Sequence, residues 1–273
     1  MTVNHNGVEY RVADAHAHIY PEKIAEKATV AIGKFYDISM DNIGIPHTLD
    51  EVEGKTGIEK TLVCSVATTV EQVSSINKFI YNKCEKYPRF IGLAAWHQDI
   101  ENIDEMLDEI QKLGLKGIKL HPDFQRVHID DERMLSFYQE ANRRNLPVLF
   151  HTGDKRTDFS SPVRLMNVIN KIPDFTCIAA HLGGYSEWED AKKDLRGTNV
   201  YIDTSSSLFA VTKEEALESI HHFGVDRTMF GTDFPMWEPK LELERFFSLE
   251  LLEKDNKKIL FDNFNRLFFN SSL

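Results

Sequence analysis

The chain has 273 residues, of which 42% are hydrophobic and 27% charged, and its net charge is −11. This length fits one domain, and the composition is ordinary for a globular protein. The acidic charge and the lack of a basic run exclude general nucleic-acid or anionic-membrane binding. Because no signal-peptide pattern or membrane-length apolar stretch is visible, we expect a cytoplasmic protein. Cys64, Cys84 and Cys177 lack a metal-type spacing, so we assign them no chemistry.

The first predicted strand, residues 11–18, ends in the segment Asp14-Ala-His16-Ala-His18. Residues two apart on a strand point to the same face, so we expect His16 and His18 to project together. Two neutral imidazoles side by side suit a divalent transition metal such as zinc. A His-x-His pattern also arises by chance, so this pair alone is weak evidence.

Seven further short apolar runs bounded by turn residues predict strands, and helical patterns lie between most of them. The predicted strands are 60–68, 89–96, 115–121, 146–151, 175–181, 199–204 and 227–233, and the helices include 71–85, 103–113, 131–144, 162–171 and 213–222. Eight strands that alternate with helices indicate a (β/α)8 barrel, formed as a single domain by residues 1–273.

The active site of such a barrel lies at the carboxyl ends of its strands. Polar residues gather at these predicted ends: His16, His18, Lys119, His121, His151, His181, Thr204 and Asp233. The least regular segment, 33–46, follows the first strand. It is long enough to form a lid over the site, although an ordinary surface loop packed by its own aromatic residues fits equally well.

Six segments, taken in order, resemble the amidohydrolase superfamily, in the branch that includes aminocarboxymuconate semialdehyde decarboxylase. They are residues 14–18, 117–122, 147–153, 180–184, 201–205 and 230–235, and the segment 257–269 resembles the family's closing helix. The resemblance implies one divalent metal, with zinc expected and manganese as the alternative, bound by His16, His18, His151 and Asp233. It also implies that His181 lies next to the bound water or substrate.

Such a ligand set is suited to two kinds of reaction. A bound metal lowers the pKa of its water, which can then attack a carbonyl carbon while Asp233 carries the proton and His181 orients the water. We therefore expect a hydrolase of a C–O or C–N bond in a small, carboxylate-bearing molecule. In the alternative, a non-oxidative decarboxylase, His181 or Asp233 protonates the carbon that loses carbon dioxide. A barrel that only binds its ligand is a third alternative.

Further residues are candidates for contacts with a small-molecule substrate. Lys119 and His121 share the fourth strand. A carbamylated Lys119 could bridge two metals, but the relatives this chain resembles are mononuclear, so we expect one ion and an interior charge. Arg156 suits bidentate binding of a carboxylate, unless its loop is simply solvated. Ser205 either lines the pocket or belongs to a helix cap, and Trp237 is a candidate pocket wall. A homodimer is left open.

Overall fold

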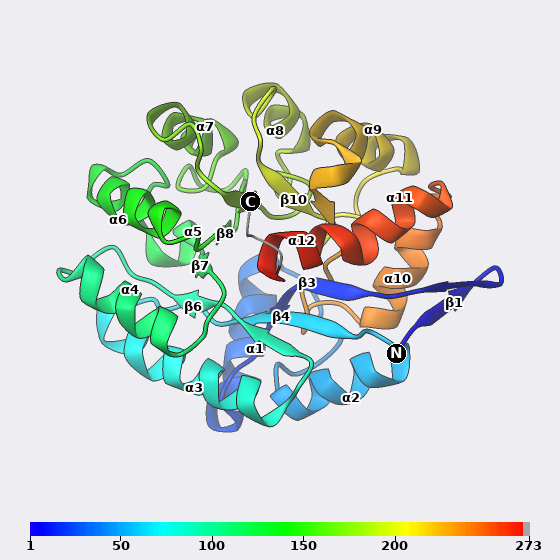
Figure 1. Ribbon diagram of the computed structural model, residues 1–273, viewed down its shortest axis with the longest axis horizontal. Helices are drawn as coiled ribbons and strands as arrows, with labels where there is room; N and C mark the ends of the chain where they lie inside the picture. Colours follow the sequence, from blue (N-terminus) through cyan, green and yellow to red (C-terminus); the bar gives the residue numbers. More distant parts are fainter. Residues whose placement is uncertain (270–273) are drawn as a thin grey trace.

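Eight parallel strand positions close into a barrel in the computed structural model, which describes residues 1–269 (Figure 1). Every predicted barrel strand is present, in a shorter form. The strands are β3 (Ala13–His18), β4 (Lys60–Cys64), β5 (Phe90–Gly92) with β6 (Ala94–Ala95), β7 (Ile118–Leu120), β8 (Val148–Phe150), β9 (Cys177–Ala179), β10 (Tyr201–Asp203) and β11 (Thr228–Met229). The (β/α)8 barrel expected from the sequence is therefore confirmed.

Two junctions hold the barrel closed. At the third strand position, β5 and β6 are separated by Leu93, whose amide donates to Val63 of β4, while the amide of Ala94 donates to Gly117 before β7. At the other junction, the segment after β11 lies beside β3, and the amide of Asp233 donates to the carbonyl of His16 at 2.7 Å. The first and last strand positions therefore adjoin at the level of the candidate site residues.

The predicted helices pack around the outside of this barrel. Each of the five begins and ends within two residues of the predicted range. The helices on the outside are α2 (Pro46–Thr56), α3 (Val73–Lys86), α4 (Ile103–Lys112), α6 (Glu132–Arg143), α7 (Pro162–Lys171), α8 (Trp188–Asp194), α9 (Lys213–Phe223) and α10 (Pro239–Phe247), with short helical turns α5 (Pro122–Gln125), η1 (Val70–Gln72) and η2 (Val225–Arg227).

The barrel interior is filled by buried side chains of several strands. Leu62, Leu149, Ile178 and Met229 form one buried cluster with Phe264 of α12 (Asn263–Phe269). This closing helix follows α11 (Glu253–Lys257) and the π-helical turn η3 (Lys258–Asp262), and it lies over the centre of the barrel in Figure 1. The resemblance of residues 257–269 to a closing helix is thus borne out, and the packed interior leaves only the opposite end open.

Helix α1 (Glu22–Tyr36) departs from the sequence expectation, which gave residues 33–46 as irregular and named no helix before them. The segment 33–36 is the last turn of this helix, and only residues 37–45 form the connection to α2. In Figure 1, α1 lies behind β3 and β4, on the side away from α12. An extra helix therefore covers the open end of the barrel.

A small antiparallel hairpin precedes the barrel. It pairs β1 (Val3–His5) with β2 (Val8–Tyr10), and its turn residues Asn6 and Gly7 both have positive φ. Alternating residues around an Asn-Gly pair are a hairpin signal that the sequence interpretation missed. Among residues 1–269, no helix is both long and apolar enough to cross a bilayer.

Candidate metal centre

Three predicted metal ligands meet at the junction between β3 and the segment after β11. His16 Nε2 lies 3.2 Å from His18 Nε2, and Asp233 Oδ1 lies 3.6 Å and 3.4 Å from these two nitrogens. His16 is fully buried, and the other two residues are largely so. Two imidazole nitrogens and one carboxylate oxygen at this spacing face a common point, as ligands of a small divalent cation do.

Asp203, at the end of β10, positions His16, and sequence reasoning missed it. Its Oδ2 accepts from His16 Nδ1 at 3.1 Å, so the lone pair of His16 is left at Nε2. Its Oδ1 accepts from the amide of His181 and the hydroxyl of Ser205. Burial raises the pKa of Asp203, but the charge and hydrogen bond of His16 more than offset it and lower that pKa. A carboxylate at the end of the seventh strand was a signal available in the sequence.

A second set of contacts holds Asp233. Ser206 donates from its hydroxyl to Asp233 Oδ2 at 2.5 Å and accepts from the indole of Trp237 at 2.9 Å. This leaves Oδ1 to face His16 and His18. Although burial raises it, the pKa of Asp233 is held well below its ordinary value by these two histidines and by His181. Trp237 thus positions the site from behind and does not line the pocket, contrary to the expectation that it forms a wall.

Lys119 of β7 is fully buried, with its Nζ 2.9 Å from His16 Nε2. Burial lowers the pKa of Lys119. Burial, followed by the charge of Lys119, also lowers the pKa of His16 to about 4, so this imidazole is neutral at pH 7. A protonated Lys119 would repel a metal ion bound between His16 and its neighbours. The structure places Lys119 behind the pocket, and it is not a lining residue.

His151, the fourth predicted ligand, makes its contacts on another side of the cluster. Its Nδ1 lies 3.0 Å from His181 Nε2, and its Nε2 lies 3.4 Å from the hydroxyl of Tyr36. The same hydroxyl lies 2.9 Å from His121 Nε2. Burial lowers the pKa of both His121 and His151 well below the ordinary value. The structure therefore brings His151 together with His181, Tyr36 and His121, and only the other three predicted ligands converge.

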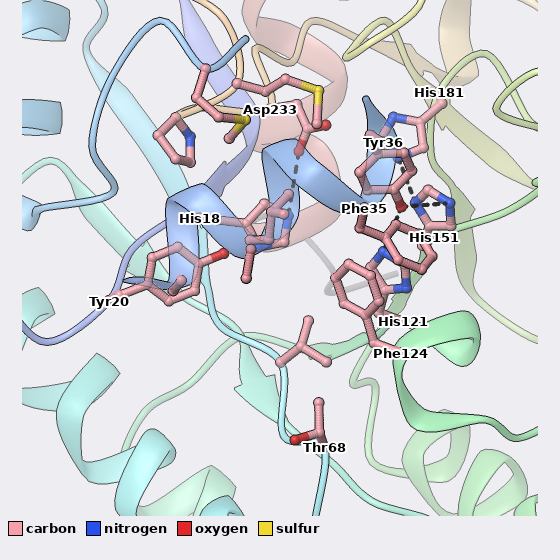
Figure 2. A pocket seen from close by; sticks show the side chains of 17 residues that line it. His18, Tyr20, Phe35, Tyr36, Thr68, His121, Phe124, His151, His181 and Asp233 are labelled. Atoms are coloured by element: carbon pink, nitrogen blue, oxygen red, sulfur yellow. Dashed lines mark hydrogen bonds and ion pairs between the residues drawn. The ribbon is translucent and has the colours of Figure 1, made fainter. Parts of the chain in front are cut away.

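A cavity of about 320 Å³ opens onto these residues (Figure 2). Its ionisable lining includes His18, His121, His151, His181 and Asp233. The rings of His121 and His151 stack on each other at 4.1 Å, and His121 stacks on Phe124 at 3.7 Å. The remaining lining is mostly apolar and includes Ala28, Ala31, Ile32, Phe35, Met40, Val66, Pro235 and Met236. Four of these belong to α1, so this helix forms a wall of the pocket, and the segment 33–46, for which a lid and a surface loop were both open, contributes Phe35, Tyr36 and Met40 to the lining.

Arg156 does not line this pocket, and its expected role in binding a carboxylate is not supported by its contacts. Its guanidinium is paired with Asp154 and donates to the carbonyl of Phe35. It also lies over the rings of Phe35 and Tyr36, at 4.4 Å and 4.7 Å from their centroids. The sequence indicated that Arg156 could bind a substrate carboxylate, but the carboxylate it binds is that of the neighbouring Asp154. Arg156 thereby holds the C-terminal end of α1 in place.

Two smaller expectations also need correction. Cys64 was assigned no chemistry, yet its sulfur lies 3.5 Å from His18 Nδ1, because β4 ends beside β3. Ser205 neither lines the pocket nor caps a helix, since residues 205–210 form turns. Its hydroxyl instead lies 3.0 Å from His16 Nδ1 and from His181 Nδ1, so it joins Asp203 in positioning both rings.

Histidines and an aspartate at the carboxyl ends of barrel strands, beneath a largely apolar pocket, define a (β/α)8 protein of the metal-dependent enzyme class. The chain belongs to the amidohydrolase family, whose model matches residues 13–269.

Solved structures of the same fold include decarboxylases and a hydrolase. A 2,6-dihydroxybenzoate decarboxylase is 18% identical, with a TM-score of 0.75 over 95% of this chain and 98% of that one. A dihydroxybenzoic acid decarboxylase from Polaromonas sp. JS666, with bound manganese, is 18% identical, with a TM-score of 0.74 over 95% and 97%. A probable 2-pyrone-4,6-dicarboxylic acid hydrolase from Acinetobacter baumannii is 14% identical, with a TM-score of 0.69 over 94% and 99%. No curated protein matched the chain.

Proposed function

We propose that this protein is a metal-dependent decarboxylase of a small carboxylic acid. The observation that supports the proposal is a cluster of histidines and an aspartate at the base of a pocket with mostly apolar walls. Similar barrels in other organisms include decarboxylases, one of them with bound manganese. Hydrolysis, the reaction first expected from the sequence, is the second candidate.

His16, His18 and Asp233 are the residues that would hold the metal, because one donor atom of each lies within 3.6 Å of the others. His151 is the predicted fourth ligand. When bound, the ion supplies a positive charge that attracts the substrate carboxylate and stabilises negative charge in the transition state. Imidazole donors suit zinc, whereas the carboxylate is equally suited to manganese, so zinc remains our expectation with manganese as the alternative.

The chain's own residues supply the remaining chemistry. The apolar walls keep water from the substrate carboxylate, and loss of solvation favours its conversion to neutral carbon dioxide. The bond between the carboxylate carbon and its neighbour breaks, and the electron pair left on that neighbour takes up a proton. His181 lines the pocket and shares a hydrogen bond with His151, so His181 Nε2 is placed to hold and deliver this proton.

One specific feature favours hydrolysis, namely the lowered pKa of Asp233. Burial raises this pKa, but the neighbouring histidines lower it by more. An ionised carboxylate can accept a proton from water, whereas it is a poor proton donor to carbon. In that case Asp233 is the base, and His181 polarises the bond that water attacks.

The test begins with elemental analysis of the purified protein, which we expect to contain one equivalent of a divalent metal. The double variant His16→Ala/His18→Ala should lose this metal and keep its circular dichroism spectrum. Metal-loaded protein is then incubated in ¹⁸O-water with aromatic and unsaturated carboxylic acids, lactones and amides. Mass spectrometry measures carbon dioxide release and ¹⁸O incorporation.

Release of carbon dioxide without ¹⁸O in the organic product supports decarboxylation, and ¹⁸O in a new carboxylate supports hydrolysis instead. His181→Asn should lower turnover by about 10²- to 10⁴-fold, the scale of a positioned acid or base, and keep its metal. Binding of acids without any turnover would leave the third alternative, a ligand-binding barrel. Full metal retention by the double variant would refute the assigned centre.

A further inference from the structure

The charges around the pocket are arranged unevenly. In the described part of the chain, no lysine or arginine side chain lines the cavity. Its ionisable lining consists of four histidines, two tyrosines and Asp233, and burial raises the pKa of both tyrosines, Tyr20 and Tyr36. A substrate anion can therefore be neutralised only at the histidine end, where the metal is proposed to bind.

The two cations nearest to this end are already engaged. Lys119 is fully buried behind the pocket, with its Nζ against His16 Nε2. Arg156 is paired with the carboxylate of Asp154, donates to Phe35 and lies over the ring of Tyr36. Its guanidinium is thus fixed outside the cavity, on the far side of the α1 rings. Neither side chain can pair with a second anionic group of a substrate without breaking these contacts.

The cavity also limits the body of the substrate. A volume of about 320 Å³ is at the small end of ligand pockets. The rings of Phe124 and His151 stack on His121 and so cover both of its faces, and the side chains of Ile32 and Val66 are among the apolar residues of the lining. Thr68 lies on the opposite side of the pocket from Asp233 in Figure 2. An uncharged ring packs well against this mostly apolar lining, whereas an unpaired charge would lose its hydration against the apolar side chains.

We propose that the pocket selects small acids with one carboxylate and an uncharged, ring-sized body, and that it discriminates against acids with a second anionic group. This inference rests on the proposed function, because it takes the histidine end as the place of the reacting carboxylate. It separates this chain from any relative that acts on a dicarboxylic acid.

The test compares two ligands of nearly the same shape, 4-nitrobenzoate and terephthalate, which differ in whether the group opposite the carboxylate is neutral or anionic. Isothermal titration calorimetry with metal-loaded protein measures both dissociation constants. We expect 4-nitrobenzoate to bind at least about tenfold more tightly, a difference of about 1.4 kcal/mol. Equal binding, tighter binding of terephthalate, or no binding of either acid would overturn the inference.

Two variants place a new charge near the end of the pocket remote from Asp233. Thr68→Lys adds an ammonium group at a lining residue that is exposed, so the fold should tolerate it. It should strengthen terephthalate binding about tenfold, about 1.4 kcal/mol, and leave 4-nitrobenzoate unchanged. Thr69→Lys is the matched control, since Thr69 is exposed and does not line the cavity, and both affinities should stay at the wild-type values. An equal effect of both variants would mean that net charge, not the pocket, sets the preference.

The proposed function and this inference can fail separately. Absence of metal, or of turnover on every acid, would contradict the proposed function, whereas the affinity ratio is measured without turnover. A decarboxylase that bound terephthalate as tightly as 4-nitrobenzoate would keep its proposed function and lose the selectivity argued here.

Discussion

Asp203 orients residues of the candidate centre by hydrogen bonds and is not itself one of the three converging donors. It is fully buried, and its two oxygens accept hydrogen bonds from His16, His181 and Ser205. The first of these contacts fixes which nitrogen of His16 faces His18 and Asp233. Loss of a carboxylate that orients a metal-binding histidine typically weakens metal affinity about 10- to 100-fold. Asp203 is therefore a positioning residue for the centre.

Replacement of this carboxylate gives a prediction at the residue scale. Asp203→Asn keeps the shape of the side chain, but its amide nitrogen is a donor and cannot accept from both His16 and His181. We expect metal affinity to fall about 10- to 100-fold, measured by competition with a chromogenic chelator. Asp174→Asn, at an exposed position, is the matched control for loss of one negative charge. Unchanged affinity in Asp203→Asn would show that His16 keeps its orientation without this partner.

The sequence predicted the positions of the site residues better than their partners. His16, His18 and Asp233 could be found because strand ends in a barrel meet at one rim. Arg156 was misassigned because its partner, Asp154, is determined by a tight turn of the loop, which the pattern of residue types does not reveal. Ser206 was missed as the partner of Asp233 for a similar reason. Ser205, Ser206 and Ser207 are identical residue types, and the sequence does not reveal the direction in which each hydroxyl points.

At the scale of elements, α1 is the part that sequence patterns failed to predict. Its buried positions are Ala25, Thr29 and Gly33, which are small or polar, and its larger apolar residues Ile32 and Phe35 line the pocket, so no run of large apolar residues marks its buried face. Gly33 has no room for a side chain, because an added Cβ would lie 2.8 Å from the carbonyl oxygen of Ile38. The barrel strands, by contrast, are continuous apolar runs buried on both faces, and such runs are easily recognised.

The attachment of α1 gives a prediction for Arg156. This residue joins the loop after β8 to the carbonyl of Phe35 and to the rings of Phe35 and Tyr36. We expect Arg156→Gln to increase amide hydrogen exchange in α1, measured by mass spectrometry, and to raise KM more than it lowers kcat. The neighbouring Lys155→Gln removes the same charge from an exposed side chain and should change neither quantity. Wild-type exchange in α1 of Arg156→Gln would show that the helix is held by other contacts.

At the scale of the whole molecule, one buried carboxyl group away from the pocket links stability to pH. Glu242 of α10 is 1% exposed, and burial, partly offset by Arg245, raises its pKa from 4.5 to about 7. Between these two values the folded protein binds this proton more tightly than the unfolded chain does. The contribution of Glu242 to stability is therefore greatest at the acidic end of this range and is lost as the pH rises to about 7.

Glu242→Gln should remove this dependence, because the amide does not titrate. Melting temperatures are measured by circular dichroism for the variant and the wild type at pH 5 and pH 8. We expect the difference, variant minus wild type, to be more positive at pH 8 than at pH 5. Glu244→Gln, on the exposed face of the same helix, is the control and should shift both curves equally. A wild-type and a Glu242→Gln protein with parallel pH profiles would contradict the assigned pKa.

The junction between the first and last strand positions has a consequence for the life of the protein in the cell. His16 and His18 leave the ribosome before Asp233, whose amide donates to His16 in the folded protein. A ribosome-bound chain that lacks the last barrel strand thus offers only two of the three converging donors, and holds an ion correspondingly loosely. Metal uptake should then follow synthesis of the last barrel strand, and supply of the ion should stabilise chains that contain this strand, whereas shorter nascent chains still depend on chaperones.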